Sequence, residues 1–77
     1  MKMIGVLKLV VTSNKKEAFN IKNRYPLFIT SSGSHFTVDD CLNFVPLTVI
    51  DIEGTPVKGY ENVCGAAFVP DMLFFDM

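Results

Sequence analysis

The sequence predicts a mainly β fold, in which residues 1–77 form one small antiparallel domain. We expect a barrel or rolled sheet of five to seven short strands, with one short helix near residues 38–45. Short apolar blocks are separated by Gly, Pro, Asn and Ser, as is typical of β-proteins. Hydrophobic residues make up 49% of the chain and its net charge is only −1, which excludes a disordered polypeptide. The length allows a single domain.

The first apolar block, residues 3–12, has apolar side chains on both alternating faces of a strand. Met3, Leu7, Leu9 and Val11 lie on one face, and Ile4, Val6 and Val10 lie on the other. A strand covered on both sides has this pattern, either in a barrel or at a subunit contact.

The next segment, residues 17–25, alternates more cleanly. Phe19, Ile21 and Tyr25 share one face, while Asn20, Lys22 and Arg24 share the other. We therefore predict a half-exposed strand that returns antiparallel to the first strand. A helix over residues 14–24 is the alternative, because its apolar residues also have tolerable helical spacing.

Pro26 is expected to interrupt the chain before a third strand at residues 27–30. A turn follows at residues 31–34, with Gly33 at a position that needs a positive φ. The period then changes, because Val38, Cys41, Leu42 and Val45 have the i, i+3, i+4, i+7 spacing of a buried helical face. Thr37 could cap this helix, Asp40 would suit its first turn, and Pro46 would end it.

The second half of the chain predicts four further strands. They fall at residues 47–53, 57–60, 64–69 and 72–76, with turns at 54–56 and at Pro70-Asp71. The ending, a strand that reaches Val69-Pro70, a tight turn and a terminal strand, is similar to the close of SH3-like or Sm-like small barrels. That resemblance covers about a dozen residues and implies only a fold outline, with no function attached.

Residues that could carry chemistry are few. Ser31-Ser-Gly-Ser-His35 contains a hydroxyl and an imidazole, but adjacent residues on a strand point to opposite faces. The single histidine and two distant cysteines do not make a metal site. We therefore expect no enzyme activity, no metal and no cofactor. A disulfide between Cys41 and Cys64 is the alternative to two buried thiols, which we prefer for a cytoplasmic protein.

Charge is unevenly distributed along the chain. Residues 1–24 hold six basic residues and one acid, whereas residues 25–77 hold one basic residue and seven acids. The basic first hairpin offers five candidate residues for a nucleotide-type small molecule or a nucleic acid: Lys15, Lys16, Lys22, Arg24 and Tyr25. An acidic second half would repel a phosphate backbone, so we do not expect nucleic acid as a partner.

The function we expect is a non-enzymatic binding or assembly module that forms a homo-oligomer. The apolar first and last strands supply the candidate interface residues Leu7, Leu9, Val11, Leu73, Phe74 and Phe75. An accessory inhibitor or sequestering protein of the phage or mobile-element type fits the length, with a protein target or an anionic small molecule as partner. The longest apolar run, residues 44–50, is too short to span a membrane. Two buried thiols suit a reducing compartment, so we expect a cytoplasmic protein.

Overall fold

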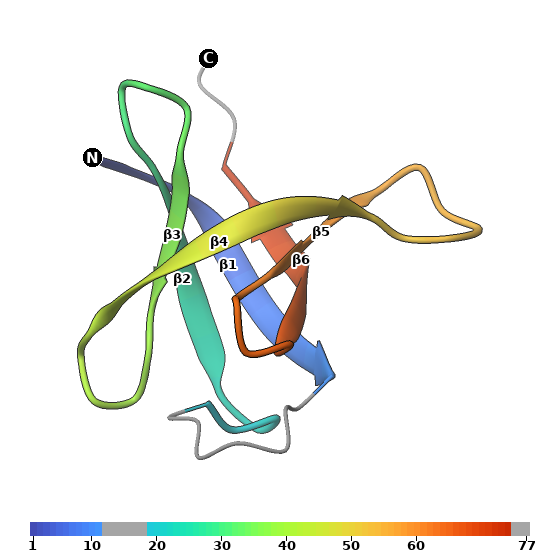
Figure 1. Cartoon of the computed structure of the whole chain (residues 1–77), viewed down its shortest axis with the longest axis horizontal. Helices are drawn as coiled ribbons and strands as arrows, with labels where there is room; N and C mark the ends of the chain where they lie inside the picture. Colours follow the sequence, from blue (N-terminus) through green and yellow to red (C-terminus); the bar gives the residue numbers. More distant parts are fainter. Residues whose placement is uncertain (12–18, 75–77) are drawn as a thin grey trace.

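The computed structural model describes residues 1–11 and 19–74, which form a closed antiparallel barrel of six strands (Figure 1). The fold class predicted from the sequence, a small antiparallel β-barrel, is therefore confirmed. Its strands are β1 (Lys2–Val11), β2 (Arg24–Ile29), β3 (His35–Val38), β4 (Phe44–Asp51), β5 (Lys58–Glu61) and β6 (Ala67–Leu73).

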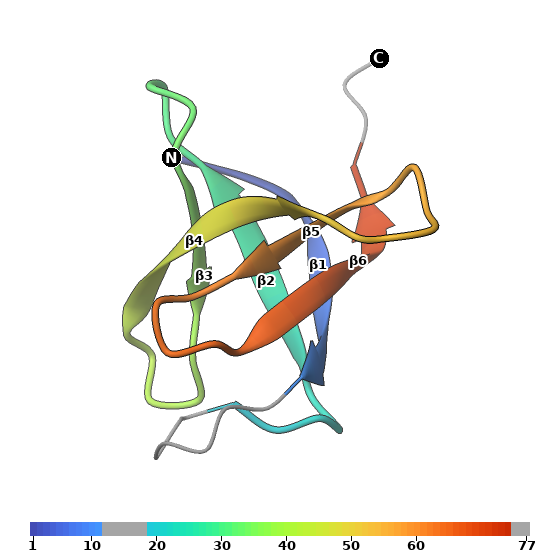
Figure 2. The same cartoon turned by 45° about the vertical axis from the view of Figure 1, so that its right-hand side comes forward.

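The strands follow one another around the barrel in sequence order, and β6 pairs with β1 to close it (Figure 2). The two long strands each belong to two ladders. The first half of β4 pairs with β3, from Phe44 to Leu47, and its second half pairs with β5, from Thr48 to Asp51. β1 pairs with β2 from Lys2 to Lys8 and with β6 from Gly5 to Val11, so its middle residues have a partner on both sides. The beginning and the end of the chain are thereby held in one sheet.

The core follows the alternation of side chains along the strands. Buried apolar side chains come from five strands and the turn before β6: Leu7, Leu9, Tyr25, Leu27, Leu47, Tyr60, Ala66 and Phe68. Phe19, which precedes β2, packs edge-on against the rings of Tyr25 and Phe68, with both centroid distances at 4.9 Å. Such edge-to-face packing is a favoured aromatic geometry.

Gly5 allows β6 to lie close to β1. A Cβ atom at this position would lie 2.5 Å from the Met72 carbonyl oxygen and 2.9 Å from a methyl carbon of Leu73. Backbone cannot yield at such a distance, so any larger residue at position 5 would push the two strands apart. The absence of a side chain at Gly5 is thus a condition for the observed closure of the barrel.

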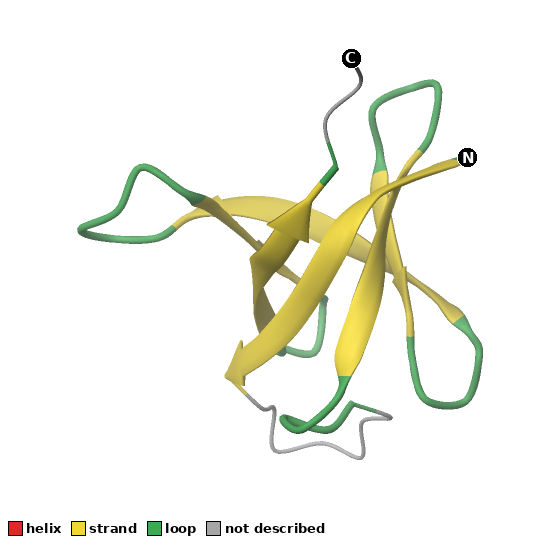
Figure 3. Cartoon of the chain, turned by 180° about the vertical axis from the view of Figure 1, so that it is seen from behind, coloured by secondary structure: helices red, strands yellow, loops and turns green. Residues whose placement is uncertain are grey.

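The predicted helix at residues 38–45 is wrong, and the described residues contain strands and turns only (Figure 3). The segment is a hairpin turn between β3 and β4. The Asp39 carboxylate accepts hydrogen bonds from the backbone N–H groups of Cys41 and Asn43, both at 2.9 Å. Leu42 has a φ of 64°, in the left-handed region. Hydrogen bonds between an aspartate side chain and nearby backbone N–H groups compete with the hydrogen bonds of a helix, so the segment forms a turn.

Two predicted breaks at proline are also wrong, because both prolines lie inside strands. Pro26 lies within β2, so the strand predicted at 27–30 starts earlier. Pro70 lies within β6, which is a single strand where a pair at 64–69 and 72–76 was expected; residues 75–76 lie outside the described part of the chain. The β1–β6 register shifts between Leu7, opposite Pro70, and Val6, opposite Met72. This bulge accommodates a proline in a strand.

The strand predicted at residues 17–25 is observed only at its last two residues, Arg24 and Tyr25, which pair antiparallel with β1 as expected; residues 17–18 lie outside the described part of the chain. Phe19 and Asn20 are irregular, a turn follows, and β2 begins only at Arg24. The alternative helix is absent from residues 19–24 too, and its remaining residues, 14–18, lie outside the described part of the chain. Asn20 explains the turn, because its side chain accepts a hydrogen bond from the Lys22 backbone N–H at 2.8 Å.

The two cysteines are free thiols, as preferred from the sequence, but the expectation that they are buried is wrong. Cys41 lies in the β3–β4 turn and Cys64 in the β5–β6 turn, and both are exposed. No helix long and apolar enough to cross a membrane occurs in residues 1–11 or 19–74.

The ring of Phe68 is the largest fully buried side chain, and we expect Phe68→Ala to lower the free energy of unfolding by about 3–5 kcal/mol. Most of the stability of a domain of this size would be lost. Urea unfolding followed by circular dichroism measures the change. Val63→Ala is the control, because Val63 is 93% exposed and should cost about 1 kcal/mol or less. Equal losses in the two variants would contradict the described core.

Candidate functional site

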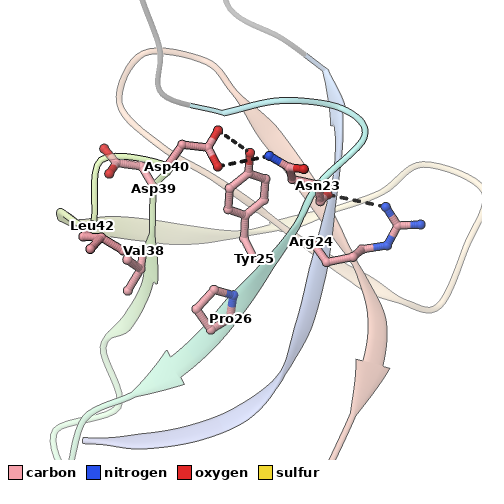
Figure 4. A pocket seen from close by; sticks show the side chains of 8 residues that line it. All are labelled: Asn23, Arg24, Tyr25, Pro26, Val38, Asp39, Asp40 and Leu42. Atoms are coloured by element: carbon pink, nitrogen blue, oxygen red, sulfur yellow. Dashed lines mark hydrogen bonds between the residues drawn. The ribbon is translucent and has the colours of Figure 1, made fainter.

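A groove of about 440 Å³ opens between the start of β2 and the β3–β4 turn (Figure 4). It lies where the β2–β3 ladder stops, since the two strands pair only through Phe28 with Phe36 and Ile29 with His35. Its lining comes from both sides of this opening: Asn23, Arg24, Tyr25, Pro26, Val38, Asp39, Asp40 and Leu42.

Pro26 is the reason that the ladder stops. Proline has no backbone N–H to donate across the sheet, so the pairing of β2 with β3 cannot continue through it. The Pro26 carbonyl instead accepts a hydrogen bond from the hydroxyl of Thr37, which is fully buried, at 2.7 Å. This bond satisfies a carbonyl that the sheet leaves without a strand partner. A side chain therefore links β2 to β3 beside the groove.

Asp40 occupies the mouth of the groove and is held on both of its carboxylate oxygens. The Tyr25 hydroxyl donates to Oδ2 at 2.9 Å, and the Asn23 side-chain amide donates to Oδ1 at 3.2 Å (Figure 4). These bonds fix the β3–β4 turn against the start of β2. They also occupy the polar groups that a ligand would otherwise meet at this point.

Opposite charges lie on the two sides of the groove. Arg24 and Asp39 point away from one another, with Tyr25 and Asp40 between them (Figure 4). Arg24 Nε donates to Asp71 of β6 at 3.1 Å, on the outer surface. In the described residues, no group of three or more His, Cys, Asp or Glu side chains could hold a metal ion. The groove is an amphipathic surface, with apolar side chains of Pro26, Val38 and Leu42 beside these charged groups.

An apolar surface continues from the groove across the outside of the barrel. Leu27 and Thr37 point inward and are fully buried, so their neighbours Phe28 and Phe36 point outward. The register places four outward residues in one row across β1 to β4: Met3, Phe28, Phe36 and Pro46. Phe44 adjoins this row, because its ring lies 6.0 Å from that of Phe28. We call Met3, Phe28, Phe36, Phe44 and Pro46 the aromatic face.

A second row runs parallel to the aromatic face and connects it to β6. Val6 of β1 pairs with Pro26 on one side and with Met72 on the other. Beyond Met72, the Phe74 backbone N–H donates to the Ile4 carbonyl at 2.8 Å, which holds this residue beside β1. Met72 and Phe74 are both exposed. The outward apolar surface therefore reaches from β4 to the last described residues.

The five residues predicted to bind an anion are only partly brought together. Lys15 and Lys16 lie outside the described residues. Lys22 and Arg24 are exposed, whereas the ring of Tyr25 is buried in the core and only its hydroxyl reaches the groove. Asp39 and Asp40 line the same groove as Arg24 and Tyr25, and Asp71 forms an ion pair with Arg24. Acidic side chains therefore surround the residues that were expected to bind an anion.

The six predicted interface residues separate into two groups. Leu7 and Leu9 are buried inside the barrel, so they offer no surface to a partner. Val11, Leu73 and Phe74 are exposed. Phe75 lies outside the described residues.

Sequence reasoning missed the aromatic face and the acidic side of the groove. Asp40 was expected in the first turn of a helix, and the outward position of Phe28, Phe36 and Phe44 was not predicted. One signal was present: Leu27 and Phe28 are adjacent and both apolar, so one of them had to face outward on a strand. Ser34 and His35, which the sequence predicts to point to opposite faces, are indeed separated. The His35 ring packs against the Tyr60 ring with a centroid distance of 5.2 Å, whereas Ser34 lies in the exposed turn before β3.

Comparisons of the chain with protein-family models, with curated proteins and with solved structures find no match.

We expect the protein to lose stability at alkaline pH because of its two tyrosines. Burial is the main cause that raises the pKa of Tyr25; the bond to Asp40 acts in the same direction and the Asn20 backbone acts against it. Burial also raises the pKa of Tyr60. Folding therefore favours the neutral phenols. This stabilisation is complete below the ordinary tyrosine pKa, about 10, and is lost as pH rises through the higher values of the folded protein.

Urea unfolding at a series of pH values from about 8 to 12 measures the loss. The double variant Tyr25→Phe/Tyr60→Phe should lose less stability than the wild type over the upper part of this range, because lysines and other groups still titrate in both proteins. Identical pH dependence of the two proteins would contradict the assignment.

Proposed function

We propose that this protein is a non-enzymatic binding and assembly module that forms a homo-oligomer. The observation that carries the proposal is the aromatic face, a row of outward apolar side chains on adjacent strands, of which Met3, Phe44 and Pro46 are exposed and Phe28 and Phe36 are half-buried. Extended exposed apolar patches on small proteins mark interaction sites, because leaving them in water is unfavourable. Three of its five residues are phenylalanines, and aromatic side chains are enriched in protein interfaces.

The closed barrel supports contact through side chains instead of through backbone. Every strand of the described barrel has two neighbours, so association by adding a strand at a sheet edge would require opening the ladder. Two copies can instead pack their outer faces together, as the sheets of a sandwich do, about 10 Å apart. The Phe44 side chain, more than half exposed, would be buried in such a contact.

The small net charge supports a second copy as the partner. At a net charge of −1, two copies have almost no overall repulsion to overcome when their apolar faces meet. The exposed Phe74, predicted from the sequence as an interface residue, adjoins the second apolar row and would extend the contact. A role as an accessory inhibitor or sequestering protein is compatible with this surface. A target protein would then compete with the second copy for the aromatic face.

A cytoplasmic location is part of the same proposal. Cys41 and Cys64 are both exposed and unbonded. Exposed free thiols persist in a reducing compartment and oxidise outside it.

Replacing Phe44 by serine should convert the oligomer to monomer. Full burial of a phenylalanine contributes about 1.5–3 kcal/mol; Phe44 is 58% exposed, so roughly half of this remains to be gained, and each dimer contact contains two copies. We therefore expect at least about tenfold weaker association. Native mass spectrometry and light scattering at micromolar concentration measure the subunit count. Val63→Ser is the matched control, because Val63 is 93% exposed in the β5–β6 turn, outside the aromatic face. A wild-type protein that is monomeric at these concentrations would overturn the proposal.

A further inference from the structure

Three turns of the described barrel share one five-residue structure. They join β2 to β3, β3 to β4 and β5 to β6, and they begin at Thr30, Asp39 and Asn62. In each turn the backbone N–H of the first residue donates to the carbonyl of the fifth, and the N–H of the fourth donates to the carbonyl of the first, at 2.9–3.1 Å. A side-chain oxygen of the first residue also accepts a hydrogen bond from the N–H of the fifth. The fourth residue therefore occupies an equivalent backbone position in all three turns.

Leu42 is the exception at this fourth position. The other two turns have Gly33 and Gly65 there, with φ of 89° and 92°, whereas Leu42 has a φ of 64°. Positive φ is strained for a residue with a side chain, and glycine adopts it freely. The Leu42 side chain is 81% exposed, so burial in the core does not compensate the strain. Strained residues of this kind concentrate at binding and active sites.

The Leu42 side chain lines the groove together with Pro26 and Val38 (Figure 4). The Asp39 N–H donates to the Asn43 carbonyl inside the β3–β4 turn, so strand alternation directs the backbone polar groups of Val38 the other way, toward β2. The β2–β3 register places Pro26 opposite Val38, and proline has no N–H to donate. The Val38 carbonyl is thus suited to accept an N–H from an extended chain that enters the groove.

The groove also holds negative charge. In the described part of the chain, the carboxylates of Asp39 and Asp40 accept hydrogen bonds from neutral donors: backbone N–H groups for Asp39, and the Tyr25 hydroxyl and Asn23 amide for Asp40. Neutral donors leave the charge of a carboxylate in place, and each oxygen can accept a further bond. The charge of Arg24 is compensated by its ion pair with β6 on the outer surface. Two negative charges therefore lie beside an apolar lining.

We propose that the groove binds a short extended peptide segment of a partner protein, with alternating apolar and basic side chains. An apolar side chain of the segment packs against Leu42 and Val38, a lysine or arginine lies beside Asp39 and Asp40, and a peptide N–H donates to the Val38 carbonyl. The lining of the groove shares no residue with the aromatic face. This inference therefore does not depend on self-association.

The strain at position 42 has its own test. Leu42→Gly should unfold at a higher urea concentration than the wild type, because glycine adopts the observed φ without strain. Gly65→Leu is the reciprocal variant: a Cβ atom there meets nothing within 4 Å, so the positive φ alone should lower the urea midpoint. A Leu42→Gly variant that is less stable than the wild type would show that this leucine supports the fold, and would overturn the inference.

Binding is measured with a pool of acetylated, amidated hexapeptides that have leucine, valine or phenylalanine at alternate positions and lysine or arginine between them. A pool with glutamate in place of the basic residues is the charge control. In NMR spectra, the basic pool should shift the amide signals of Val38 and Leu42. Leu42→Gly should bind this pool about tenfold more weakly, because an apolar contact is lost. Val63→Ala, which shortens an exposed side chain in the β5–β6 turn, should bind like the wild type.

Asp39→Asn tests the charge and keeps the turn, because Asn62 accepts the equivalent hydrogen bonds in the β5–β6 turn. This variant should bind the basic pool about threefold more weakly than the wild type. Its binding should also depend less on salt concentration.

The outcomes decide the inference in either direction. It is overturned by the absence of shifts with the basic pool at about 1 mM peptide, by equal shifts with the glutamate pool, or by undiminished binding of Leu42→Gly. It is also overturned if the wild type binds no peptide while Leu42→Gly loses self-association in native mass spectrometry, because the groove then belongs to a contact between copies. A Leu42→Gly variant that is more stable and binds the basic pool more weakly supports it.

Discussion

The pairing of β1 with both β2 and β6 is the constraint on which the rest of the structure depends. It joins the beginning of the chain to its end and closes the barrel. Gly5 makes this closure sterically acceptable, because a Cβ atom there would meet the backbone of β6. Once the barrel is closed, each strand has a definite inner and outer side, and eight buried residues suffice for a core. Long-range pairing of this kind must compensate a large loop entropy before the core can form.

Much of the fold was predictable from the sequence because strand alternation and turn residues act locally. The turn at residues 31–34, with Gly33 at a φ of 89°, and the strand around residues 47–51 follow from such local signals. The helix prediction failed for a specific reason. Val38 and Val45 have helical spacing along the sequence, but they belong to two strands of one hairpin, with the Asp39 side chain holding the turn between them.

The candidate site was less predictable because it depends on register. The groove arises where β2 and β3 stop pairing and diverge. Its position is set by Pro26, whose carbonyl accepts a hydrogen bond from the Thr37 hydroxyl instead of from a strand partner. No periodicity relates these two residues, because they meet only through the register of the β2–β3 hairpin. The aromatic face is likewise a row of residues from four strands, and only their cross-strand alignment makes it continuous. Pro26, which was expected to interrupt the chain, thus lies between the groove and the aromatic face.

The closed ladder has a consequence for how such a protein can change over time. Inward residues such as Leu27 and Thr37 specify the barrel, whereas their immediate neighbours Phe28 and Phe36 contribute little to the core. The two sets alternate along the same strands but are subject to separate physical demands. Substitutions on the outer set can therefore alter partner choice while the inner set preserves the architecture. A single short chain in this arrangement can keep its shape and still acquire new associations.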